Sequence, residues 1–445
     1  QYHFIKRPYQ LVPLTAVAMP TVQYYNASGQ KLKASAPTKD IAKSVYTITI
    51  KKGIYYQPHP ALAHDKNGKF YYHNLKASDL ANINTLGDFK HKGTRELTAS
   101  DYIYQIKRLA HPEVSSPIFR FVSHHIVGLK AYAKQLQKTY KAAQEKAPDP
   151  YLDLRQHPIE GVKFINKYTF SITIKGKYPQ FMYWLAMPFF APMPWEADKF
   201  YHQPGMDEKN INLDWYPIGT GPYMLTENNP NQRKIKKKNP NFRGEIFPNA
   251  KNDPRSGKLM PFINKVVFSL EKESIPRWTK FLQGYFDQSS ISSDNFDQAV
   301  SVNSDGSIQL SSELKGKGLR LHTSIEPAIY YLGFNMLDPI VGGKSERARK
   351  LRLAIAIALD YEEYIAIFFN GRGQTAHGPI PPGIFGNLPG KAGINPYLYN
   401  WNNKRAERKS IDAARKLMRE AGYPNGIDPK TKKALILHYD VAGGT

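Results

Sequence analysis

Residues 217–223 read Pro217-Ile218-Gly219-Thr220-Gly221-Pro222-Tyr223, and residues 239–242 read Asn239-Pro240-Asn241-Phe242. The first motif predicts a tight turn, because glycine allows backbone geometry that other residues avoid. No helix start follows the turn, so it is not a glycine loop that cradles a phosphate. Basic residues alternate between the two motifs, as suits an exposed strand: Arg233, Lys234, Lys236, Lys237 and Lys238. We therefore interpret residues 217–242 as a structural turn that leads into a strand.

Mixed strands and helices are predicted on both sides of this turn. Alternating apolar and polar residues predict strands at 44–51, 164–174, 265–270 and 434–439. Capping residues predict helix starts at Thr98, Ser345 and Asp360. A further amphipathic helix is predicted at 409–421, ended by Gly422 and Pro424. The elements follow no regular βαβ rhythm, which predicts α/β lobes built on mixed sheets.

The composition limits the function. A chain of 445 residues is too long for one core and predicts two or three domains. The absence of cysteine excludes a catalytic thiol, thiolate zinc sites and iron–sulfur ligation. The adjacent pair His124-His125 does not favour a metal site, because neighbouring side chains point apart. No hydrolase, metalloprotease or nucleotide-binding motif is present. We expect no enzymatic activity, no metal and no cofactor.

The net charge of +25 leaves more than one partner open. Such a charge is compatible with nucleic acid, an anionic membrane surface or an acidic ligand. The basic residues are scattered, and no nucleic-acid-binding motif accompanies them. We favour a solvated basic surface and expect no nucleic acid. Binding of a polyanion stays open as an alternative.

The segments resemble, in order, the family 5 extracellular solute-binding proteins, which are the dipeptide- and oligopeptide-binding components of ATP-driven bacterial importers. The most specific match is the P-x-G-T-G-P-Y and N-P-x-F pair at 217–242. Similar motifs cover about residues 5–440. They are the T-A-x-D run at 98–112, L-x-x-G-Y-x-D at 281–287, L-x-F-N at 332–335 with the helix at 349–360, the proline loop at 378–382, and the A-x-x-K-L helix at 413–422.

The resemblance implies a fold of the type II periplasmic binding proteins. This is an α/β architecture with mixed sheets, in which two lobes close over a ligand at a hinge. Lobe I would comprise residues 1–43 and 195–292, with residues 44–194 as an inserted subdomain. Lobe II would comprise residues 293–445 and be incomplete. Both termini look truncated, because family members begin earlier and continue through an acidic loop after the strand at 434–439.

The resemblance also implies a function. We expect a monomeric periplasmic protein that captures oligopeptides and delivers them to the membrane permease of an ABC importer. A membrane anchor before residue 1 is left open. The same fold could instead bind a metal chelate, haem, a sugar or a peptide antibiotic.

Candidate ligand-binding residues follow from the family's cleft. Serine hydroxyls after the strand expected at 284–287 could pair with ligand amides, although a serine-rich turn is the alternative. Tyrosines near the cleft strand of lobe II could equally belong to a core. The histidine pair could lie where the subdomain approaches the cleft or at a surface position. The candidates are Ser289, Ser290, Ser292, His124, His125, Tyr330, Asn335, Gln374, His377, Tyr439 and Asp440.

Overall fold

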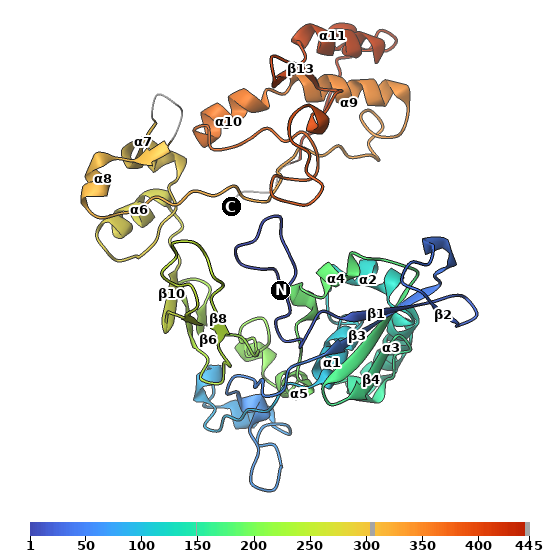
Figure 1. Ribbon diagram of the computed structural model, residues 1–445, viewed down its shortest axis with the longest axis vertical. Helices are drawn as coiled ribbons and strands as arrows, with labels where there is room; N and C mark the ends of the chain where they lie inside the picture. The colour runs from blue at the N-terminus through green and yellow to red at the C-terminus, as the bar shows by residue number, and fades with distance from the viewer. Residues whose placement is uncertain (148, 303–307, 441–445) are drawn as a thin grey trace. The chain divides into compact units, whose positions relative to one another are not determined.

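The computed structural model describes residues 1–147, 149–302 and 308–440. The chain forms two compact units (Figure 1). The first contains Gln1–Lys6 and Gln10–Leu270, and the second contains Arg7–Tyr9 and the chain from Glu271 onward. The lobe and subdomain boundaries that the resemblance implies stay a prediction.

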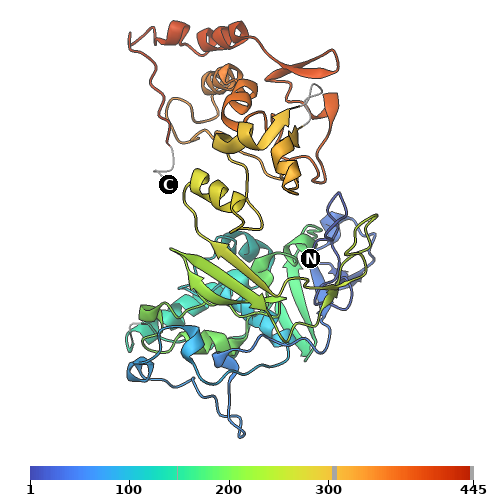
Figure 2. The same ribbon diagram turned by 90° about the vertical axis from the view of Figure 1, so that its left-hand side faces the viewer.

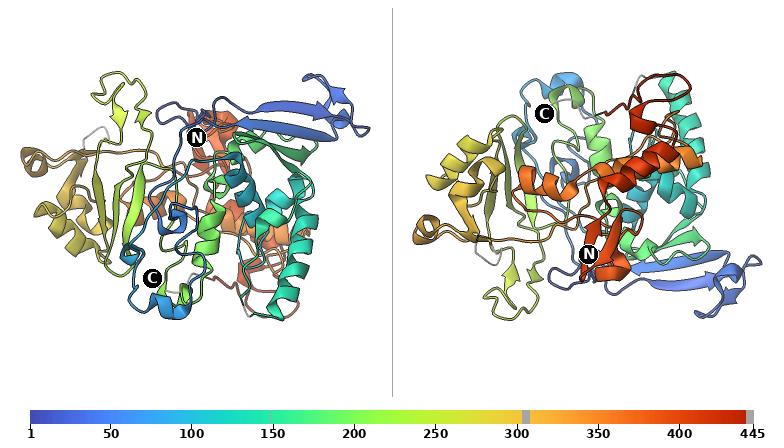
Figure 3. Two further views of the ribbon diagram at one scale, coloured as in Figure 1. Left: turned by 90° about the horizontal axis from the view of Figure 1, so that it is seen from below. Right: turned by 90° about the horizontal axis from the view of Figure 1, so that it is seen from above.

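The first unit is built around a five-stranded antiparallel sheet in the order β2-β1-β3-β5-β4. Figure 3 shows β1 and β2, in blue, as a hairpin at its edge. Tyr46, Ile48 and Ile50, which alternate along the strand predicted at 44–51, are buried. Residues 164–174 form a hairpin rather than one strand, with a turn after Asn166. The strands are β1 (Thr21–Tyr25), β2 (Lys31–Leu32), β3 (Lys43–Thr49), β4 (Val162–Asn166) and β5 (Thr169–Lys175).

Helices α1 and α2 pack on β5, and α3 packs on α2. The predicted capping box begins α1, because the Thr98 amide donates to the Asp101 carboxylate at 2.9 Å. Apolar side chains from these helices and the sheet form one large core with Phe181 and Phe200. The helices of this unit are α1 (Ala99–Arg108), α2 (Phe119–His125), α3 (Leu129–Gln144), α4 (Phe181–Trp184) and α5 (Trp195–Tyr201).

A second antiparallel sheet of the first unit has the order β10-β7-β6, and the basic run forms its central strand (Figure 2). The two opening motifs join at its end, where the Asn239 side chain donates to the Gly221 carbonyl at 2.9 Å. Neither Gly219 nor Gly221 has a positive φ, so the turn does not use the left-handed backbone geometry that glycine allows. The hydrogen bond from Asn239 stabilises the turn instead. The strands are β6 (Tyr223–Asn229), β7 (Arg233–Lys238) and β10 (Lys265–Ser269), with a small hairpin β8 (Glu245–Ile246) and β9 (Leu259–Met260).

The second unit has two smaller cores, one around Trp278 and Phe296 and one around Leu351 and Tyr423. Helices α9 and α11 pack along each other beside the second core (Figure 1). The helices are α6 (Ser274–Leu282), α7 (Phe296–Ala299), α8 (Ser312–Gly316), α9 (Glu346–Ala358), α10 (Tyr361–Phe369) and α11 (Ile411–Glu420). The strands are β11 (Val300–Val302), β12 (Ile308–Leu310), β13 (Tyr399–Asn402) and β14 (Arg405–Arg408).

The helix ends predicted in the second unit are confirmed. Ser345 accepts from the amide of Ala348, and Asp360 accepts from the amide of Glu363. Gly422 follows α11 with a φ of 80°. Helix α10 has no buried residue, and Ile367 and Phe368 are 61% and 59% exposed.

Two expected strands of the second unit are wrong. Residues 284–287 and 434–439 form no strand in the described structure. The last segment makes only a single bridge, between Ala434 and Ile427. A segment forms a strand only where another strand pairs with it, and no strand of the described structure pairs with these two. No helix among the described residues is long and apolar enough to cross a membrane.

Candidate functional site

The predicted serine loop of the second unit lies against the end of α10. The Ser293 hydroxyl donates to the carbonyl oxygen of Phe368 at 3.0 Å. Arg372, just after α10, donates to the carbonyl oxygen of Ile291 at 2.6 Å and to the Ser293 hydroxyl at 3.1 Å. The fold therefore joins two candidate regions that are far apart in the sequence, the loop at 289–293 and the segment at 370–377.

Arg372 is the group that positions this loop. Its guanidinium also donates to the Phe369 carbonyl at 2.9 Å and lies 5.1 Å from the centre of the Phe296 ring. None of the carboxylates in the described residues forms an ion pair with it. No carboxylate of the described chain thus neutralises the positive charge next to the serine hydroxyls. Such a group can bind a carboxylate or another anion.

We expect the substitution Arg372→Gln to loosen the serine loop. It removes two hydrogen bonds from a charged donor to residues 291 and 293, so we expect exchange of the Asn295 amide to rise by roughly tenfold. Hydrogen–deuterium exchange of the peptide covering residues 288–296 measures this. Arg349→Gln is the control, since the ion pair of Arg349 in the described structure is with Glu346 of its own helix. Equal exchange in wild type and both variants would show that Arg372 does not hold the loop.

The predicted serines differ in how free their hydroxyls are. Ser290 is exposed. Ser289 donates to the carbonyl of Ser290 at 3.2 Å, and Ser292 accepts from the Asn295 side chain at 2.9 Å. Ser290 is therefore the most available of the three to a ligand.

His377 lies beside a charged cluster. Its ring packs edge-on against Tyr399 with 4.6 Å between centres, and its Nδ1 atom is buried without a hydrogen-bond partner. The Tyr399 hydroxyl donates to Glu362 at 3.0 Å, and burial together with this carboxylate raises the pKa of Tyr399. Arg408 bridges Glu362 and Asp360. The cluster joins β13 and β14 to α10, which is a structural role.

The remaining candidates of the second unit are exposed. Tyr330 and Tyr439 are 82% and 71% exposed, so neither belongs to a core within the described structure. Gln374 and Asp440 are exposed as well. Asn335 is exposed, and its side chain accepts from the amide of Leu337 at 3.0 Å. That hydrogen bond caps a local turn, which is a common role of asparagine.

His124 and His125 lie at the end of α2 in the first unit. His124 is exposed, whereas His125 packs on Tyr178 and Trp184, with ring centres 4.5 Å and 5.3 Å apart. Burial, with smaller contributions from neighbouring positive groups, lowers the pKa of His125. The described residues hold no group of three or more side chains suited to a metal ion.

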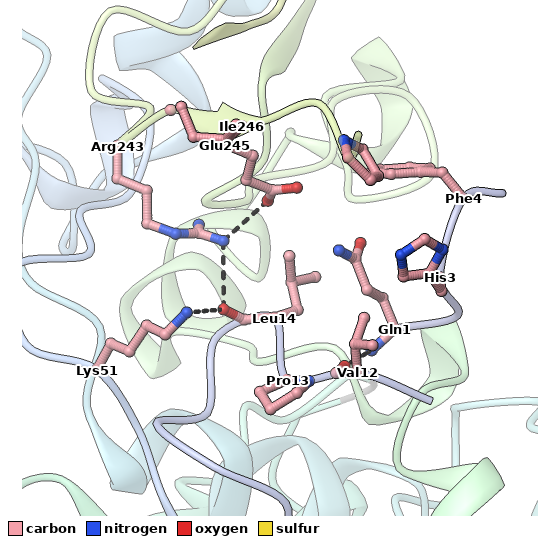
Figure 4. A pocket seen from close by; sticks show the side chains of 12 residues that line it. Gln1, His3, Phe4, Val12, Pro13, Leu14, Lys51, Arg243, Glu245 and Ile246 are labelled. Atoms are coloured by element: carbon pink, nitrogen blue, oxygen red, sulfur yellow. Dashed lines mark hydrogen bonds and ion pairs between the residues drawn. The ribbon is translucent and has the colours of Figure 1, made fainter. Parts of the chain in front are cut away.

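Two pockets lie in the first unit. One of about 320 Å³ is near the histidine pair and is lined by Ser123, Lys130, Lys134 and Lys175. The other, of about 340 Å³, lies between the N-terminal segment and β8 (Figure 4). There Lys51 and Arg243 both donate to the carbonyl oxygen of Leu14, and Arg243 also pairs with Glu245 at 2.9 Å. These bonds fix the chain segments that line this pocket.

Sequence reasoning missed Arg372, Glu362 and Arg408. The local sequence around Arg372, Gly371-Arg372-Gly373, predicts only a turn. The contacts of Arg372 and Arg408 span about 80 and about 50 positions of the chain.

Comparison with known proteins defines the class. Residues 32–444 match the family model described as bacterial extracellular solute-binding proteins, family 5, middle. The chain belongs to this family and has its mixed α/β fold. Family members are solute-binding proteins.

Individual relatives are distant. Heme-binding protein A of Haemophilus influenzae is 24% identical over 289 residues, covering 64% of this chain and 43% of the relative. The periplasmic oligopeptide-binding protein OppA of Salmonella typhimurium is 23% identical over 331 residues, covering 74% and 49%. This chain thus spans about half the length of these relatives. A solved structure of DppA from Helicobacter pylori with the peptide STSA matches 96% of this chain and 60% of that one, at 16% identity and a TM-score of 0.49.

Proposed function

We propose that this protein is the extracytoplasmic binding component of an ABC importer and that it captures oligopeptides between two lobes. The observation that carries the proposal is the family match over residues 32–444. The periplasmic oligopeptide-binding proteins among its relatives favour peptide as the ligand and the periplasm as the location. Delivery to a membrane permease and a monomeric state are parts of the same proposal.

Residues of the second unit would contact the ligand. Ser290 offers a hydroxyl to peptide amides, and Arg372, which no described carboxylate pairs with, offers a positive charge to a carboxylate. Tyr330, Gln374 and Asp440 are exposed and would supply further contacts. Small polar groups and main chain would bind the peptide backbone, which requires no particular ligand side chain.

Thermal unfolding with peptides tests the proposal. A pool of dipeptides to octapeptides is expected to raise the melting temperature, because a ligand at ~100 times its Kd stabilises the folded state by about 2.7 kcal/mol. The matching mixture of free amino acids is the control. No shift with any peptide pool would contradict peptide binding.

A second candidate ligand is haem, since one relative is a haem-binding protein. The net charge of +25 favours the anionic propionates of haem. Titration with haem, followed by the haem absorption band, distinguishes the two ligands. Saturable haem binding without any peptide-induced shift would replace peptide with haem and leave the fold assignment unchanged.

A further inference from the structure

The sheet β10-β7-β6 is strongly positive. Its three strands contain five lysines and one arginine but a single carboxylate, Glu227. Glu227 pairs with Arg233 at 2.7 Å. The lysines Lys234, Lys236, Lys237, Lys238 and Lys265 form no ion pair with any described residue. The described residues therefore leave most of the positive charge of this sheet free to attract an anionic partner.

Three of these lysines stand on one face. Lys234, Lys236 and Lys238 alternate along β7, so their side chains point to the same side at a spacing of about 7 Å. All three are exposed. Glu227 lies opposite Ile235 and so belongs to the other face. The lysine face thus carries no carboxylate from its own strands.

Apolar side chains share this face. Phe268 pairs with Lys234 across the strands and is 52% exposed. The Lys236 ammonium lies 5.3 Å from the centre of the Phe268 ring. Leu270, two residues further along the chain, is 44% exposed. Exposed lysines around aromatic and aliphatic side chains are the composition of surfaces that lie in a membrane interface.

We propose that the face formed by Lys234, Lys236, Lys238 and Phe268 binds the surface of an anionic phospholipid bilayer. Lysines are compact charges that suit a diffuse anionic surface, whereas Phe268 and Leu270 can enter the boundary between headgroups and acyl chains. A single strand of nucleic acid would call for a row of aromatic rings for stacking, and in the strands of this face only Phe268 and Tyr223 are aromatic. The inference concerns the membrane and does not depend on which solute the protein binds.

Co-sedimentation with vesicles tests this proposal on the full chain. Vesicles of phosphatidylcholine and phosphatidylglycerol in equal parts are expected to bind the protein, and vesicles of phosphatidylcholine alone are not. The triple variant Lys234→Gln, Lys236→Gln, Lys238→Gln should weaken binding by roughly 100-fold. Phe268→Ala should weaken it by roughly tenfold. The single variant Lys236→Gln, with a loss of roughly fivefold, serves if the triple variant does not fold.

The matched control is a second set of three exposed lysines in the same unit. Lys134, Lys138 and Lys141 lie on one side of α3 and form no ion pair in the described structure. Their replacement by glutamine changes the net charge equally and should leave vesicle binding within about twofold of wild type. An equal loss in both triple variants would overturn the proposal, because net charge alone would then explain binding. Lack of wild-type binding to anionic vesicles, or tighter binding to a single-stranded oligonucleotide that the β7 variant loses, would also overturn it.

Discussion

Replacing Arg95 with methionine is expected to destabilise the first unit by about 4 kcal/mol. The Arg95 guanidinium bridges Asp101 and Glu196, each at 2.6 Å. Both carboxylate side chains are almost fully buried, at 2% and 5% exposure. Without the arginine, two negative charges remain in the core with no cation between them. Leaving a buried charge without its partner costs more stability than breaking an exposed ion pair.

Hydrogen exchange in peptides of α1 and β5 measures this loss within the first unit. The two units need not unfold together, so a single melting curve would not show which unit has lost stability. Arg95→Lys should lose about half as much, because it keeps the charge without the forked donors. Arg233→Met is the control, since its pair with Glu227 is exposed and is expected to contribute under about 1 kcal/mol. Similar losses for Arg95→Met and Arg233→Met would refute the argument.

Acid should destabilise the first unit through His59. Its Nδ1 atom accepts from the amide of Ala61, and its Nε2 atom bonds to the hydroxyl of Tyr201, which donates to the Tyr216 carbonyl. This network requires the neutral ring, because protonated Nδ1 would face another donor. Burial lowers the pKa of His59 from 6.5 to about 3.

The lowered pKa of His59 sets the sign of the pH dependence of stability. Below pH 6.5 the unfolded chain takes up a proton that the folded chain refuses until about pH 3. Stability is therefore complete above 6.5 and falls through this window by roughly 1.4 kcal/mol per pH unit, or about 2 kcal/mol between pH 7 and 5. His59→Gln should have a shallower slope of stability against pH, measured by hydrogen exchange in peptides of the first unit. The exposed His124→Gln serves as control, and an unchanged slope in His59→Gln would contradict the assignment.

Local signals predicted the fold better than long-range ones. Thr98, Ser345 and Asp360 cap helices as expected, because a cap depends only on residues three positions away. The residues at 434–439 have a strand pattern but no partner strand among the described residues, and pairing is not encoded in the segment itself.

The same holds for the candidate site, which stays a prediction. The serine loop was a candidate because it follows residues 284–287, whereas Arg372, which positions it, was not a candidate. Its role arises only when folding brings residues 291 and 372 together. The histidine pair was found by its rarity, but its two members differ, and only the packing distinguishes His124 from His125.

The exposed apolar helix α10 has a consequence for how the protein behaves in concentrated solution. Its four exposed large side chains, Tyr364, Ile367, Phe368 and Phe369, favour contact between molecules. The net charge of +25 keeps molecules apart at low ionic strength. Salt shortens the range of that repulsion to about 10 Å at 0.1 M but leaves the apolar attraction in place. Colloidal stability should therefore fall as the salt concentration rises. The protein is expected to stay dispersed in a buffer of low ionic strength.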